Sequence, residues 1–141
     1  MSTNLSIQES LYPELICFGC GHANPHGFHL RSYREGDLTV AEFKPRPEHD
    51  NGFGVVNGGI IATVLDCHGA AAVMWEVAQR HWNDPTGRLV PFLTASFEVT
   101  LHRPTPLGPS RWGCQRLGVA LVHTVAHAHQ PPVPALWSNQ L

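Results

Sequence analysis

The chain has 141 residues, of which 43% are hydrophobic and 14% are charged, a composition typical of one globular domain with a buried core. Its formal net charge of −2 leaves no basic excess to neutralise a phosphate backbone, so we expect no nucleic-acid partner. We interpret residues 1–141 as a single domain, with 1–15 as a loose or helical leader. The leader lacks the basic and apolar stretches of a secretion signal, which predicts a cytoplasmic protein.

The first third of the chain predicts a loop followed by a β-hairpin. Residues 16–27 are dense in glycine, asparagine and proline, which is typical of a structured loop. Residues 28–33 and 38–44 then predict two strands, with a hairpin turn at 34–37. Apolar and polar residues roughly alternate in the second strand, as expected of a strand with one buried face.

A long helix is predicted from Gly58 to Gln79, after a loop at 45–57. Asn57 precedes it as a plausible N-cap, because its side-chain oxygen can accept a hydrogen bond from an amide of the first turn. The helix is apolar nearly all round, which is typical of a buried helix, and a sheet wrapped around it is one of the few ways to bury it. Its apolar stretch, 60–73, is interrupted by polar residues and too short to cross a bilayer, so we expect no membrane partner.

The segment after the helix predicts one further strand and then an unusual tail. Residues 80–88 form a loop, residues 91–102 alternate strictly enough for a long strand, and residues 103–108 form a turn. The tail, 109–141, contains no acidic residue and includes a proline-rich run that cannot join a central strand. We expect at most one strand there, at 118–128, and the loss of acidic residues raises the hypothesis of a translated frameshift.

Three motifs in order resemble the PaaI-like and THEM-type hotdog thioesterases. The segment from Val56 to Asp66, VNGGIIATVLD, is similar to the family's HGG…D motif. Upstream, CFGCG begins at Cys17 and NPHG at Asn24; downstream, TASFEV begins at Thr94 and RPTPLG at Arg103. The resemblance spans about residues 17–108. The tail departs from it, because relatives end in two charged, alternating strands.

This resemblance implies an α+β hotdog fold, a curved antiparallel sheet wrapped around the helix at 58–79. It also implies hydrolysis of acyl-CoA thioesters at sites on the interface of a homodimer or of a dimer-of-dimers tetramer. No separate cofactor is implied, because coenzyme A is part of the substrate. The acyl group is left open, and phenylacetyl-type, benzoyl-type and fatty acyl groups are all compatible with the residues.

The candidate catalytic residues lie on the helix and around it. A helix N-terminus presents free amide donors, and Gly58 and Gly59 have no side chain to block a thioester oxygen from approaching them. In the family the amide that binds this oxygen matches Gly58. Asp66, two turns further on, matches the carboxylate that serves as general base or as nucleophile. Thr94 and Asn51 match residues that position the attacking water in some relatives.

Other residues complete the predicted site or are set aside. Asn57 stands where relatives carry histidine, and an amide there can still cap the helix or contact the acyl group. Trp75 and Phe92 are candidates to line an acyl pocket, although core packing is the commoner role of such residues. We interpret His68 as a packing residue, because it lies nearly opposite Asp66 on the helix.

No metal site is expected, and two other functions remain open. Cys17 and Cys20 form a CxxC pair with His22 nearby, but the sequence has no second CxxC pair to complete a zinc site. A hotdog hydratase or dehydratase would use a histidine, and the asparagine at position 57 counts against it. A non-catalytic acyl-CoA binding protein would fit the altered tail.

Overall fold

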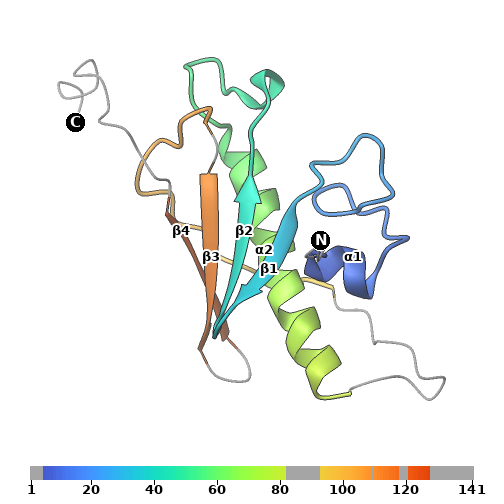
Figure 1. Ribbon diagram of the computed structural model, residues 1–141. Helices are drawn as coiled ribbons and strands as arrows, with labels where there is room; N and C mark the ends of the chain where they lie inside the picture. The colour runs from blue at the N-terminus through green and yellow to red at the C-terminus, as the bar shows by residue number, and fades with distance from the viewer. Residues whose placement is uncertain (1–4, 82–92, 109, 118–120, 128–141) are drawn as a thin grey trace.

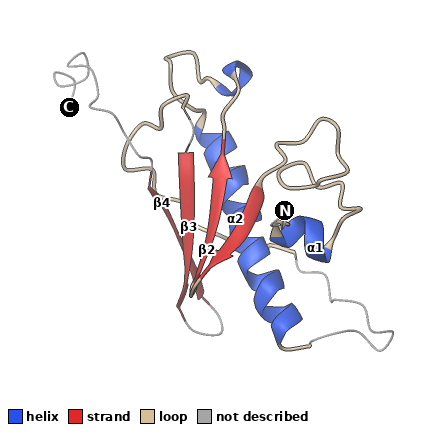
Figure 2. Ribbon diagram, viewed as in Figure 1, coloured by secondary structure: helices blue, strands red, loops and turns tan. Residues whose placement is uncertain are grey.

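The computed structural model describes residues 5–81, 93–108, 110–117 and 121–127, the last two ranges by the course of their backbone. Its elements are α1 (Ile7–Leu11), β1 (Arg31–Glu35), β2 (Leu38–Phe43), a 3-10 turn (Pro47–His49), α2 (Gly58–Gln79), β3 (Ser110–Leu117) and β4 (Leu121–His127). The four strands form one antiparallel sheet in the order β1-β2-β3-β4, and α2 lies against all four of them (Figure 1). Coloured by secondary structure, the sheet forms one layer and α2 the other (Figure 2). The expected packing of an antiparallel sheet on one long helix is therefore present.

The predicted hairpin is confirmed, with β1 beginning later than expected. Gly36 in the turn has a φ of 58°, a left-handed conformation that glycine adopts without steric cost. β1 begins only at Arg31, because Phe28 and Leu30 donate their backbone amides to carbonyls of the preceding loop rather than to β2. These bonds hold the loop against the start of the hairpin.

α2 begins and ends at the predicted residues, and Asn57 caps it. The side-chain oxygen of Asn57 accepts a hydrogen bond of 2.8 Å from the Gly59 amide. The expectation that the helix is buried all round is wrong for the single chain. Its buried residues are Ile61, Val64, Cys67, His68, Ala71 and Val77. Burial is partial because the sheet of one chain covers one side of α2.

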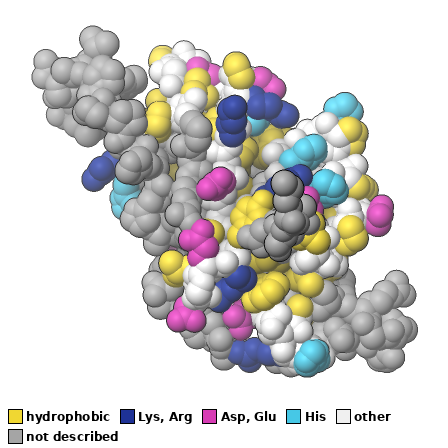
Figure 3. Space-filling model, viewed as in Figure 1, with side chains coloured by type: hydrophobic (Ala, Val, Ile, Leu, Met, Phe, Trp, Pro, Cys, Tyr) yellow, Lys and Arg dark blue, Asp and Glu magenta, His cyan; other side chains and the backbone are white. Residues whose placement is uncertain are grey.

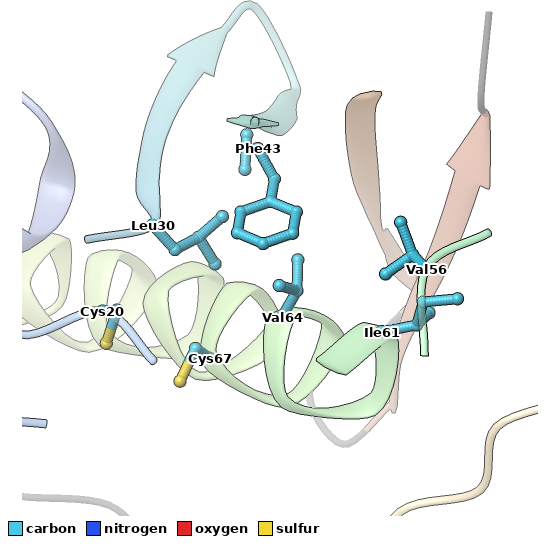
Figure 4. Packing of buried hydrophobic residues seen from close by; sticks show 8 residues of the cluster. Cys20, Leu30, Phe43, Val56, Ile61, Val64 and Cys67 are labelled. Carbon is cyan, nitrogen blue, oxygen red and sulfur yellow. The ribbon is translucent and has the colours of Figure 1, made fainter. Parts of the chain in front are cut away.

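The main core lies between α2 and the hairpin (Figure 4). Val64 is fully buried and points toward Leu30 and Phe43, while Ile61 packs beside Val56 near the start of the helix. Complete burial of one such side chain is worth about 1.5–3 kcal/mol. Among the described residues α2 is the one helix long and apolar enough to cross a membrane, a test that the core helix of a globular protein also meets.

A buried polar chain joins α1, β1 and α2. His68 is fully buried, and its Nδ1 lies 3.0 Å from the Ser32 hydroxyl. The Gln8 side chain makes two hydrogen bonds with Ser32. Its Nε2 donates to the Ser32 hydroxyl at 3.1 Å, and its Oε1 accepts from the Ser32 backbone amide at 3.0 Å. The Ser32 hydrogen is then available to Nδ1 of a neutral His68. The interpretation of His68 as a packing residue is confirmed.

The strand predicted at 91–102 is absent from its described part. Residues 93–102 form no ladder with the sheet, and Leu93, Phe97 and Leu101 are 93%, 54% and 53% exposed. Strict alternation predicts which side chains a strand would bury, but a strand also needs an edge to pair with. The four-stranded sheet of this chain does not supply that edge to the segment.

The tail forms more sheet than expected. β3 pairs with the whole length of β2, with Val40 opposite Gly113, and β4 pairs with β3, with Trp112 opposite Ala126. β4 lies within the strand expected at 118–128, and β3 is a second strand that the sequence did not predict. The few charged residues and scattered prolines of the tail are not typical of strands, so its sequence indicated them only weakly. The strands form nevertheless, because backbone pairing with β2 depends little on side-chain charge. The described strands end at His127, before the proline-rich run.

Burial of His68 predicts that the protein loses stability in mild acid. Burial lowers the pKa of His68 from 6.5 to about 4, because the charged ring would lose its hydration. Between these values the unfolded chain binds a proton that the folded chain rejects, so the free energy of unfolding should fall as pH drops from 6.5 to about 4. The loss is on the order of 3 kcal/mol. Burial also lowers the pKa of His49, which adds a loss in the same direction.

Urea denaturation at a series of pH values measures this slope. His68→Asn is the matched variant, because its side-chain oxygen can accept the Ser32 hydrogen bond but cannot take up a proton in this range. The variant should lose much less stability than the wild type over the same interval. Equal slopes in the two proteins would contradict the assignment to His68.

Candidate functional site

Asp66 projects from the side of α2 that is turned away from the sheet. Residues two apart on a helix differ in direction by about 200°, so Asp66 lies opposite both Val64 and His68, which face the hairpin. The carboxylate is partly exposed. Its position on α2 thus follows from the burial of its neighbours, and it leaves the group open to a ligand.

Thr94 is the direct partner of Asp66. Its hydroxyl donates to Oδ1 of Asp66 over 2.6 Å, across 28 positions of sequence. A hydroxyl at this distance from a carboxylate makes a strong, charge-assisted bond that fixes the orientation of the acceptor. The second carboxylate oxygen makes no hydrogen bond to the described residues. The pair therefore offers a water molecule one oriented acceptor next to a hydroxyl.

The N-terminus of α2 presents one free amide. The Gly59 amide is occupied by the cap from Asn57, whereas the Gly58 amide has no hydrogen-bond partner among the described residues. A Cβ atom placed on Gly58 would come within 3.1 Å of the Leu101 side chain, so an apolar group lies beside this glycine. The positive end of the helix dipole adds to its affinity for a developing negative charge. Of the two predicted glycines, Gly58 keeps its amide available to a ligand.

Asn51 lies in the loop before α2, and part of its side chain is already used. Its Oδ1 accepts from the Phe53 amide at 2.9 Å, and its own backbone amide donates to the Val55 carbonyl at 2.9 Å. The loop is fixed by Val56, which donates to the Thr105 carbonyl at 2.8 Å. Nδ2 of Asn51 makes no hydrogen bond to the part of the chain that the structure describes, so this donor is the one it can offer to a ligand.

The predicted pocket residue Trp75 lies away from Asp66. Trp75 lies nine positions beyond it on α2, which places it about 13.5 Å along the axis and on the opposite side of the helix. Phe92 lies outside the described residues. Leu101, which was not among the residues predicted for the site, lies beside Gly58 at the start of α2. Its position in the sequence, at the end of the alternating segment 91–102, was the feature that could have indicated it.

The face of the molecule on the outer side of the sheet carries mixed charge (Figure 3). On the face drawn in Figure 3, acidic and basic side chains are interspersed and no field of lysine and arginine is visible among the described residues.

Comparisons with known proteins identify the family of the chain. No family model matches the chain, and no curated protein matches it. A solved structure of a thioesterase superfamily protein from Shewanella loihica PV-4 is 32% identical, covers 74% of this chain and 84% of that one, and superposes with a TM-score of 0.57. This identity over most of both chains shows a common family as well as a common fold. The chain belongs to the thioesterase superfamily.

Proposed function

We propose that the protein hydrolyses an acyl-CoA or aryl-acyl-CoA thioester, as a member of the PaaI-like and THEM-type branch of its superfamily. The observation that carries the proposal is the short hydrogen bond from Thr94 to Asp66 on the open side of α2. In this assignment Asp66 is the general base or the nucleophile, and the Thr94 hydroxyl orients both the carboxylate and the attacking water. Coenzyme A enters as part of the substrate, and no separate cofactor takes part.

The Gly58 amide is assigned to the thioester oxygen. Negative charge builds on that oxygen as the tetrahedral intermediate forms, and an amide already aimed at it needs no reorganisation. Gly58 is partly exposed and its amide has no hydrogen-bond partner among the described residues, which supports the role, whereas the Gly59 amide is held by Asn57. Leu101 beside Gly58 supports an apolar contact with the acyl chain or with the thioester sulfur. We assign Asn51 the role of orienting the attacking water, by donating a hydrogen bond from Nδ2, which makes no hydrogen bond to the described residues.

The site is proposed to form between two copies of the chain. Gly58 and Asp66 of one helix are separated by about 12 Å along its axis, whereas a base and an oxyanion donor each act within about 3 Å of the reacting atoms. Two helices side by side in opposite directions would bring Gly58 of one chain near Asp66 of the other. The exposed apolar side chains of the unpaired segment 93–101 support a homodimer in which this segment finds a partner.

The first test removes the carboxylate and its partner separately. Asp66→Asn should lower kcat by about a hundred- to ten-thousandfold while leaving the fold intact, because an amide is a poor base. Thr94→Val should lower it by about ten- to a hundredfold, which corresponds to one hydrogen bond to a charged group. Thr94→Ser keeps the hydroxyl and should retain most of the activity. Release of the CoA thiol from a panel of alkyl- and aryl-CoA esters is the measurement.

Unchanged turnover in Asp66→Asn would contradict the assignment of the carboxylate. Tight binding of acyl-CoA by the wild-type protein without any turnover would contradict hydrolysis and identify a binding protein. Conversion of an enoyl-CoA to its hydrated product, without release of the CoA thiol, would identify a hydratase instead.

The second test deletes the amide donor at Gly58 alone. Proline fits the first position of a helix, and Asn57 before it already has the extended conformation, with a ψ of 136°, that proline requires of its neighbour. Gly58→Pro should lower kcat by about a hundred- to a thousandfold, because it removes one oxyanion donor. Gly58→Ala, which keeps the amide and adds the same β-carbon beside Leu101, is the matched control and should lose far less. Equal losses in both variants would show a steric effect.

The third test asks whether the two halves of the site come from different chains. Asp66→Asn and Gly58→Pro subunits, each inactive alone, should regain activity when mixed and allowed to exchange. Random pairing gives one intact site in each mixed dimer, so about a quarter of the wild-type activity should return. No recovery, in mixtures shown to contain mixed dimers, would place both residues in one chain's site.

A further inference from the structure

Three cysteine thiols meet beside α2. Cys17 and Cys20 come from the loop after α1, and Cys67 comes from the middle of α2. Their sulfur atoms all lie within 4.8 Å of one another, and those of Cys17 and Cys67 are 3.8 Å apart. Figure 4 shows the Cys20 and Cys67 side chains pointing to the same side of the helix. The fold thus adds a third thiol to a CxxC pair that is fifty positions away in sequence.

The loop backbone is built to bring these sulfur atoms together. A β-carbon on Gly19, between the two loop cysteines, would overlap the sulfur of Cys67, so only glycine lets the loop approach α2 this closely. The Gly21 amide donates to the Cys17 carbonyl at 2.9 Å, and the Gly19 carbonyl accepts from Leu30 at 3.1 Å. The position of the thiols is therefore set by backbone bonds as well as by side-chain packing.

The spacing of the sulfur atoms fits a shared metal ion better than a disulfide. Two thiolates bound at about 2.3 Å to one tetrahedral zinc ion stand about 3.8 Å apart. The measured separations begin at 3.8 Å and reach no more than 4.8 Å, so small side-chain movements would suffice. A disulfide would require two sulfur atoms to close to about 2.05 Å and would leave the third thiol unused.

The protonation of the cluster also bears on metal binding. A hydrogen bond with Cys20 and burial raise the pKa of the Cys67 thiol. A thiophilic cation reverses this balance, because it displaces the protons and neutralises the thiolates that burial disfavours. Cys17 is partly exposed, whereas Cys20 and Cys67 are buried, so an ion and the displaced protons have a path on the Cys17 side.

We propose that Cys17, Cys20 and Cys67 bind one thiophilic divalent metal ion, with zinc as the probe. The ion ties the Cys17–Cys20 loop to α2 at the residue that follows Asp66. Three protein ligands leave a fourth position for water or another external ligand on the side of Cys17. His22 does not fill it, because its Nδ1 faces Glu9 at 3.7 Å.

Metal titration of the reduced, full-length protein tests this site directly. One Co²⁺ ion per chain should bind with the strong near-ultraviolet absorption of thiolate-to-cobalt charge transfer, and Zn²⁺ should displace it. Cys17→Ser, Cys20→Ser and Cys67→Ser should each weaken binding at least about tenfold, because each removes one of three ligands. Zinc should also raise the Tm of the wild-type protein, since a ligand that binds the folded state stabilises it.

Cys114→Ser is the matched control, because it removes the remaining cysteine of the sequence and keeps all three thiols of the cluster. It should bind cobalt with the wild-type stoichiometry and affinity. Absence of the charge-transfer band in the wild-type protein would overturn the proposal, and so would a band that survives in all three cluster variants. Both readouts are independent of enzymatic activity, so a failure here is distinguishable from a failure of the proposed hydrolysis.

Discussion

The packing of one side of α2 on the sheet is the constraint on which the rest of the structure depends. Val64 and His68 are fully buried against the hairpin, and successive residues of a helix differ in direction by about 100°. Once these two side chains are fixed, Asp66 must face the side opposite the sheet. Cys67 must then point sideways, about midway between the sheet side and the Asp66 side. The burial of two core residues therefore decides the direction of the Asp66 and Cys67 side chains.

Each direction on the helix meets a different part of the chain. The sheet side meets the buried polar chain of His68, Ser32 and Gln8, which orients α1 and β1. The Cys67 side meets the loop that carries the other two thiols. The open side meets Thr94, whose segment also places Leu101 beside Gly58. One helix thus supports a structural face, a thiol cluster and a carboxylate site without their side chains competing for space.

On the open side of α2, apolar side chains of the chain remain exposed to solvent. Apolar side chains of the segment 93–101 are exposed, and this segment has no strand partner among the described residues. Exposed apolar groups beside an oriented carboxylate are typical of a surface that a second molecule covers. Burial of α2 was overestimated from its composition, because the sheet of the chain covers one side of the helix.

The sequence by itself determined the helix from Gly58 to Gln79, its Asn57 cap and the hairpin, because caps, turns and periodicity are local properties of neighbouring residues. It also pointed to Asp66 and Thr94, although their contact across 28 positions became visible only in the fold. The tertiary structure alone decided the pairing of β3 and β4, the missing edge for residues 93–102 and the third thiol at Cys67. These depend on which distant segments meet, and a pattern along the chain cannot encode the partner of an edge or the neighbour of a buried sulfur atom.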